Sequence, residues 1–220
     1  MKTFLISILI LSSLTGYCQD KTDNKSNWNV GITFSPDNYF KSTSISTGSE
    51  IGYRLNPSGF SFTTGFVGLY SIESKFDIGA GIDYSQKAFS GRSYCNLCDF
   101  LIPPKPEPIF QRFIEIPLFL RYNILDKKFG VHAEAGLTSG YLINNIGTQY
   151  EETLSCNKFQ LTGQIGLGIK LNLGQRINLI LSSAYNHPFT SFSKGINSNF
   201  SFVSVETGFT YLFKKNKIIE

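Results

Sequence analysis

Alternation between apolar and polar residues is the feature that most constrains this chain. In the segment Phe113–Tyr141, apolar side chains occupy every second position of two successive runs, with polar or small residues between them. Such alternation predicts β-strands with one apolar and one polar face. Similar runs continue along the chain without a helical period, so an all-β protein is predicted. The eight runs are Trp28–Phe34, Phe60–Ile72, Lys75–Phe89, Gln111–Asn123, Phe129–Ile143, Phe159–Asn172, Arg176–His187 and Ser201–Phe213.

Short and long connections alternate strictly between these runs. The short ones are Glu73-Ser74, Ile124–Lys128 and Leu173–Gln175, and the long ones are Ser35–Gly59, Ser90–Phe110, Asn144–Lys158 and Pro188–Phe200. A soluble sandwich has no reason to gather its long loops at one end, whereas a bacterial membrane barrel does. We therefore predict an antiparallel, eight-stranded, transmembrane up-and-down β-barrel with short periplasmic turns and long extracellular loops.

The composition of the two strand faces indicates which one points inward. The polar parity is rich in glycine, for example Gly79, Gly81, Gly166 and Gly168. Small residues suit the narrow interior of an eight-stranded barrel, so the polar parity is predicted to face inward and the apolar parity to face lipid. Aromatic residues at both strand ends predict two membrane-interface girdles. One comprises Trp28, Tyr70, Phe76, Tyr122, Phe129, Tyr211 and Phe213, and the other Phe60, Phe89, Phe110, Phe159, Phe189 and Phe200.

The N-terminus predicts export from the cytoplasm. Lys2 precedes the apolar run Phe4–Leu14, which is typical of a signal peptide and too short to span a membrane. Small residues favour cleavage between Cys18 and Gln19, and Tyr17 argues against lipidation of Cys18. The predicted organisation is a signal peptide (1–18), a periplasmic segment (19–27), the barrel (28–213) and a polar tail (214–220). The formal net charge of +4, without a basic stripe, gives no indication of nucleic-acid binding.

Charged residues on the inward parity are the first candidates for a functional site. Buried charges must be paired, so we expect a salt-bridge and hydrogen-bond network that fills the barrel, with an ion path as the alternative. No cofactor is expected. The predicted network comprises Asp77, Asp83, Glu115, Arg121, His132, Glu134, Lys170, Arg176 and Glu206.

Three cysteines lie in the long loops. Cys95 and Cys98 form a C-x-x-C pair, and Cys156 follows in the next long loop. An oxidising compartment favours a disulfide, either within the pair or from one of its members to Cys156. A free or intermolecular thiol and a metal site are the alternatives, although a zinc site would require further ligands.

The residues allow two other functions. His187 and Ser191 stand near the long-loop end of a strand, where some barrel enzymes that modify lipids place a histidine base and a hydroxyl nucleophile. Neither a G-x-S-x-G motif nor an orienting carboxylate accompanies them. A soluble, secreted barrel that binds a small ligand would instead use the apolar parity as its core.

The strands FIEIPLFLRY and FGVHAEAGLTSGYL and the closing GFTYLF resemble the outer-membrane β-barrel domain family that includes the PorT-like proteins of Gram-negative bacteria. Gly208, Tyr211 and Phe213 resemble the signal read by the barrel assembly machinery. The resemblance implies an integral outer-membrane protein whose partners are outer-membrane lipid, that machinery during biogenesis, and an envelope protein bound through the loops. Binding, envelope maintenance or service in a secretion or transport assembly is the expected function, without catalysis.

Overall fold

Ten β-strands make up the computed structural model. It describes residues 28–40, 43–46, 51–73, 75–95, 105–126, 128–147, 156–174, 176–191 and 199–213. The strands are β1 (Trp28–Tyr39), β2 (Thr43–Ser46), β3 (Ile51–Pro57), β4 (Ser61–Ser71), β5 (Phe76–Cys95), β6 (Glu107–Asp126), β7 (Phe129–Ile146), β8 (Phe159–Asn172), β9 (Ile177–Pro188) and β10 (Phe202–Phe213).

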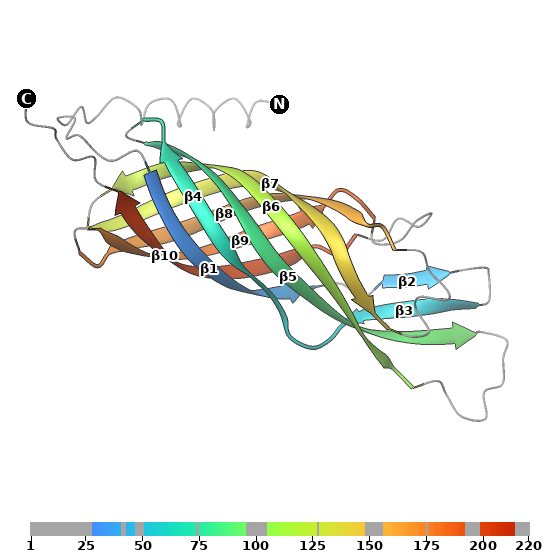
Figure 1. Cartoon of the computed structure of the whole chain (residues 1–220). Coiled ribbons are helices and arrows are strands. Elements are labelled where there is room, and N and C mark those ends of the chain that lie inside the picture. The colour runs from blue at the N-terminus through green and yellow to red at the C-terminus, as the bar shows by residue number, and fades with distance from the viewer. Residues whose placement is uncertain are drawn as a thin grey trace, which may run out of the picture.

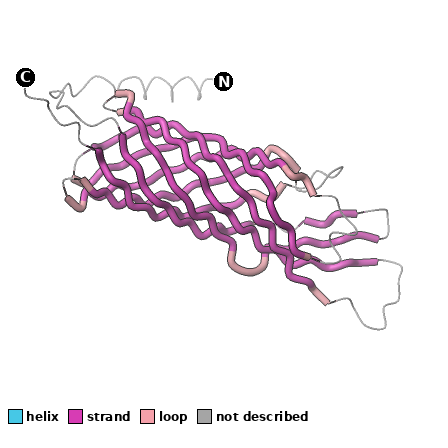
Figure 2. Tube along the Cα trace, viewed as in Figure 1, coloured by secondary structure: helices cyan, strands magenta, loops and turns pink. Residues whose placement is uncertain are grey.

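Eight of these strands close into an antiparallel barrel (Figures 1 and 2). Around the ring the order is β1, β4, β5, β6, β7, β8, β9 and β10, and β10 pairs back onto β1. Each strand lies beside its neighbour in the chain once the short β2 and β3 are set aside, so the predicted up-and-down topology is confirmed. Within the residues described, no helix is long and apolar enough to cross a membrane.

Several strands are longer than the alternation predicts. β8 has the predicted bounds, whereas β1 continues to Tyr39 and β5 and β6 each have 20 residues. A tilted strand needs only about 9–11 residues to cross a bilayer. β5 and β6 are therefore roughly twice the length that the membrane requires, and their excess projects from the long-loop end of the barrel (Figure 1).

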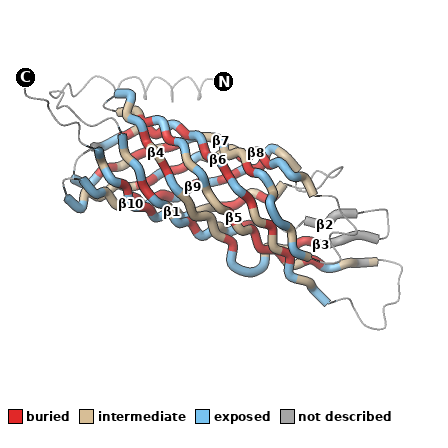
Figure 3. The backbone as a smooth tube through the Cα atoms, in the orientation of Figure 1, coloured by how far each residue is buried: buried red, intermediate tan, exposed pale blue. Residues whose placement is uncertain are grey.

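The predicted inward and outward faces match the observed burial along the barrel strands. On β6, Ile116 and Leu118 are 54% and 58% exposed, whereas Arg121 on the other parity is 3% exposed. Figure 3 shows the same alternation of exposed and buried positions along the barrel. The apolar outward surface therefore meets lipid, and the polar residues fill the interior.

The excess length of β5 carries two further strands of the same sheet, β2 and β3, outside the barrel. β4 pairs with β5 as far as Phe62 opposite Gln86, and β3 then takes over the same edge from Pro57 opposite Phe89 to Ile51 opposite Cys95. The chain passes between β3 and β4 at Gly59, whose φ of 89° favours glycine. β2 pairs with β3. We call β2, β3, residues 89–95 of β5 and residues 107–109 of β6 the extension.

An apolar cluster fastens the extension to the barrel mouth. Leu55 and Ile109 are fully buried in it, and the Phe89 ring packs against Tyr39 at 5.3 Å and Phe200 at 5.1 Å between ring centroids. We call this cluster, completed by Phe202, the cap. Phe89 and Phe200, at 2% and 3% exposure, therefore lie inside the mouth, and their predicted place in the lipid-facing girdle is wrong.

Candidate functional site

Two ion pairs occupy the interior of the barrel. Lys87 lies 3.1 Å from Glu115 and donates a hydrogen bond of 2.8 Å to the Gln160 side-chain oxygen. Its ammonium also lies 4.3 Å from the centre of the Phe113 ring, within cation–π range. These contacts tie β5, β6 and β8 together across the lumen. Buried charges are stable only when paired in this way.

The second pair lies nearer the short-turn end. The Arg121 guanidinium donates to Glu134 at 3.1 and 3.4 Å, and the ring of His132 lies 3.8 Å from the same carboxylate. The ring nitrogen Nε2 of His132 also contacts the Ser182 hydroxyl at 3.2 Å. Asn123 donates to Asp77 at 2.8 Å on the neighbouring strand. The structure thus brings β5, β6, β7 and β9 together through side chains at this level.

A cavity of about 70 Å³ separates these two levels. This volume holds a few water molecules and no larger solute. Acidic groups from opposite sides of the barrel line it: Asp37, Asp83, Glu115, Glu134 and Glu206. Asp37 accepts a hydrogen bond of 2.7 Å from Thr63. The geometry is a polar, water-accessible chamber between two charged layers.

Most of the predicted interior residues face this lumen. Asp77, Glu115, Arg121, His132 and Glu134 are buried, and Asp83 and Glu206 line the cavity. Lys170 lies on the inward parity of β8, two residues after Gly168. Arg176 does not belong to the network, because it precedes β9 at a short turn, where it is exposed and donates to the Tyr211 hydroxyl at 2.8 Å.

Lys87, Gln160 and Asp37 belong to the interior network, although the predicted network does not include them. Lys87 lies within the predicted strand and on the same parity as Asp77 and Asp83. The alternation alone therefore indicates that Lys87 points inward. Asp37 is absent from the predicted network because the predicted strand ends at Phe34. Pro36 lies where the register of β1 against β10 is interrupted, between Phe34 opposite Thr207 and Asp37 opposite Ser204, so the missing proline N–H falls at a gap in that ladder.

The cysteines are only partly described. The Cys156 sulfur packs against the cap and accepts hydrogen bonds from Gln111 and Asn145, each at 3.5 Å. Within the described residues Cys156 forms no disulfide, so the pairing of Cys95 or Cys98 with Cys156 is wrong. Cys98 lies outside the described residues, and its pairing with Cys95 stays a prediction.

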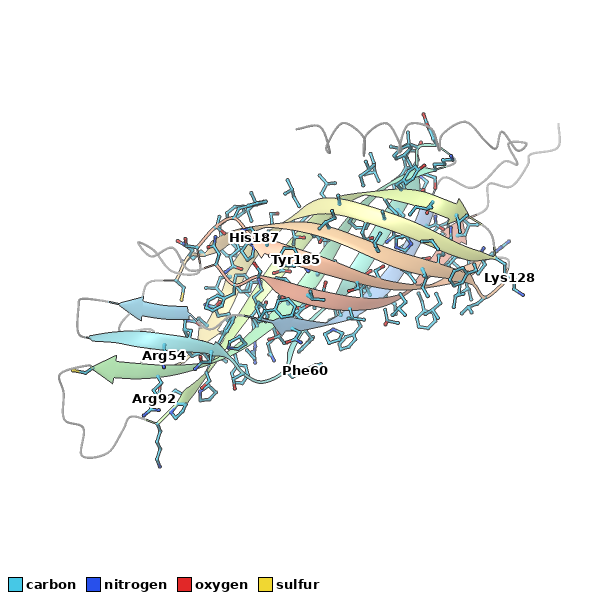
Figure 4. The ribbon with its side chains drawn as sticks, turned by 180° about the vertical axis from the view of Figure 1, so that it is seen from behind. Arg54, Phe60, Arg92, Lys128, Tyr185 and His187 are labelled. Carbon is cyan, nitrogen blue, oxygen red and sulfur yellow. The ribbon has the colours of Figure 1, made fainter. Side chains whose placement is uncertain are left out.

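The rim histidine has a different partner from the one expected. The ring nitrogen Nδ1 of His187 contacts the Ser201 hydroxyl at 2.9 Å, and its ring packs edge-on against Phe189. Ser191 instead accepts a hydrogen bond from Asn157 through its backbone carbonyl. His187 is exposed on the lipid-facing side of β9, next to Tyr185 on the same parity (Figure 4).

The residues of the expected assembly signal lie on the closing strand. Gly208 is buried opposite Thr33 of β1, and Tyr211 and Phe213 are exposed at the short-turn end with their ring centroids 5.2 Å apart. Phe213 pairs with Trp28, so β10 meets the first strand where the barrel closes.

A closed eight-stranded barrel with an apolar outer surface and a polar interior defines a transmembrane β-barrel. The chain belongs to the outer membrane protein beta-barrel domain family, whose model matches residues 18–194. It is therefore an integral outer-membrane protein.

Solved structures of outer-membrane proteins are similar to this chain at low sequence identity. OprG of Pseudomonas aeruginosa has a TM-score of 0.54 and 12% identity over 89% of this chain and 100% of its own. Neisserial surface protein A has a TM-score of 0.49 and 13% identity over 87% of this chain and 100% of its own. A search of curated proteins returns no match.

Proposed function

We propose that this protein is a binding protein of the outer membrane, which acts through the extension while its barrel stays closed to solutes. The observation that carries the proposal is a sheet built beyond the membrane and anchored by fully buried side chains, Leu55 and Ile109. A flexible loop would lose more conformational entropy on binding than a sheet that is already ordered. The extension therefore suits a surface that holds a partner in a fixed orientation.

The closed barrel supports binding rather than transport. The cap lies at the barrel mouth, and the Lys87–Glu115 and Arg121–Glu134 pairs lie deeper in the lumen. Eight strands leave an interior just wide enough for side chains. The interior network thus has a structural role in this proposal, and the partner is bound outside.

Two partners follow from the sequence. The PorT-like resemblance implies a component of a secretion or transport assembly. During biogenesis, Gly208, Tyr211 and Phe213 would present β10 to the barrel assembly machinery. Residues 1–18, which lie outside the described residues, would direct export and then be removed by cleavage between Cys18 and Gln19.

Site-specific photo-cross-linking in intact cells tests the proposal. A cross-linking amino acid at Ser93 of the extension is compared with one at Lys128, in a short turn at the other end. We expect a discrete adduct from position 93 that is absent from position 128. The absence of any adduct at the extension, with the barrel folded, would contradict a binding function there.

A second candidate function depends on one contact. The His187–Ser201 hydrogen bond places a base beside a hydroxyl at the lipid-facing rim, as acyl-ester hydrolysis requires. Replacing Ser201 by Ala would abolish deacylation of outer-membrane lipid in a mass-spectrometric assay if this pair is catalytic. An unchanged lipid profile would exclude this pair as the catalytic dyad and leave binding as the function.

A further inference from the structure

Three buried polar atoms gather at the barrel mouth without a hydrogen-bond partner among the described residues. They are the Tyr39 hydroxyl and the side-chain oxygens of Gln111 and Asn145. Gln111 lies directly opposite Lys87 of β5 on one side and Asn145 of β7 on the other. The Tyr39 ring packs on Phe89, two residues above Lys87 on the same inward face. A buried polar group without a partner is unfavourable, so a ligand that pairs with these atoms would be stabilised.

A small pocket opens into the mouth at this level. Its volume is about 10 Å³, the space of one water-sized group. The Tyr39 side chain, 8% exposed, lines it together with aromatic rings of the cap. Lys87 and Gln160 form its floor, joined by their hydrogen bond of 2.8 Å. We call it the mouth pocket; its aromatic wall is Phe89, Phe200 and Phe202.

Phe200 is the side chain through which the mouth pocket can enlarge. Its ring is 3% exposed and lies 5.1 Å from the Phe89 ring between centroids. Phe200 precedes β10, which begins at Phe202, so its ring can turn away without breaking the pairing of β10 with β1 or β9. The space of one phenyl ring then becomes available between the Phe89 ring and the polar floor.

The charges around the mouth pocket favour a neutral ligand. Among the described residues that line it, Lys87 is the one charged side chain, and Glu115 at 3.1 Å neutralises it. A charged ligand would lose its hydration without gaining a counter-ion. Hydroxyl groups both donate and accept hydrogen bonds, so they can pair with the Tyr39 hydroxyl and with amide side chains. A neutral, hydroxylated ring of the size of phenyl fits these requirements.

We propose that the mouth pocket binds the six-membered ring of a neutral sugar in the place that the Phe200 ring occupies in this structure. The C–H groups on one face of the sugar pack against the Phe89 ring, whose face is electron-rich, and the sugar hydroxyls pair with Tyr39. The Lys87–Glu115 ion pair stops the sugar at the mouth, so the barrel stays closed beneath it. This site is separate from the extension and does not depend on the proposed function.

Titration of the purified full-length barrel with methyl glucoside, methyl galactoside and methyl mannoside tests the proposal. Saturation-transfer NMR in a detergent without sugar groups measures the binding. We expect Phe200→Ala to bind one of these sugars about tenfold more tightly than the unchanged protein, because no ring has to be displaced.

The Tyr39 hydroxyl supplies the second variant. Adding Tyr39→Phe to Phe200→Ala should weaken binding about tenfold, because one hydrogen bond is lost while the ring remains. The matched control adds Tyr185→Phe, which removes the same group from the lipid-facing side of β9 (Figure 4). This control should bind like Phe200→Ala alone.

Three results would overturn the proposal. These are no binding of any of the three sugars to Phe200→Ala, an equal effect of Tyr39→Phe and Tyr185→Phe, and binding of cyclohexanol as tight as that of the sugars, which would indicate an apolar cavity. The difference in gel mobility between boiled and unboiled samples verifies that each variant is folded. Phe200→Leu, a smaller change, replaces Phe200→Ala if the latter fails to fold, and it should also bind more tightly. A position-93 cross-link that persists without sugar binding would reject the mouth pocket while the proposed function stands.

Discussion

At the scale of single residues, glycine and a large side chain share the same layer of the barrel interior. Gly79 of β5 lies opposite Phe119 of β6, and a methyl group added at Gly79 would overlap the Phe119 ring. Phe119 itself packs with Val67, Leu69 and Ile180 in a buried cluster. The glycine is therefore required by the close approach of an aromatic ring, not by an unusual backbone conformation.

Replacing Gly79 by Ala should lower the free energy of unfolding by about 1–3 kcal/mol, because overpacking forces the ring to move. Urea unfolding in lipid vesicles, followed through the fluorescence of Trp28, measures the change. The matched control is Gly68→Ala, where the nearest atom to the new methyl is 3.8 Å away. Adding Phe119→Leu to Gly79→Ala should restore part of the loss. Equal stability of the two alanine variants would contradict this packing argument.

The buried pair Arg121–Glu134 supports a second prediction at this scale. Glu134→Ala leaves a guanidinium of 3% exposure without its carboxylate, and such a loss costs about 3–5 kcal/mol. The double variant Arg121→Met with Glu134→Leu removes both charges and should unfold closer to the unchanged protein. Glu73→Ala, in an exposed turn, is the control. A double variant no more stable than Glu134→Ala would show that the charges do not act as a pair. The same urea assay reports the result.

At the scale of elements, the extension depends on the cap for its position. Leu55→Ala removes a fully buried side chain, a change that typically costs about 2–5 kcal/mol. Because β3 lies outside the closed ring, we expect the barrel to remain heat-modifiable on gels while a protease cleaves the extension faster. Asn56→Ala, one residue along the same strand, is the control. Unchanged protease resistance of Leu55→Ala would mean that the cap does not anchor the extension.

Whether a strand lies within the membrane or beyond it explains which elements the sequence predicts well. β8 was predicted with its observed bounds because lipid and lumen impose strict alternation along its whole length. The end of β5 and the hairpin of β2 and β3 lie beyond the membrane, where both faces of a strand tolerate polar residues and the alternation disappears. The inward parity identifies Glu115 and Arg121 as interior residues. The partners with which they form ion pairs depend on the register between strands, and alternation within one strand does not determine that register.

At the scale of the whole molecule, three sets of side chains block the lumen: the cap, the charged side chains, and the apolar cluster of Val67, Leu69, Phe119 and Ile180. In planar bilayers we expect no stepwise channel opening from the unchanged protein. One double variant, Phe89→Ala with Phe200→Ala, opens only the cap. A second, Lys87→Ala with Arg121→Ala, removes only cationic side chains from the lumen. Each double variant alone should therefore leave the conductance low. All four changes together with Phe119→Ala, which opens the apolar cluster, should give cation-selective openings, because Asp37, Asp83 and Glu206 would then line a continuous path. Open channels in the unchanged protein would instead mean that these side chains move aside, and the extension would then stand at the entrance of a pore.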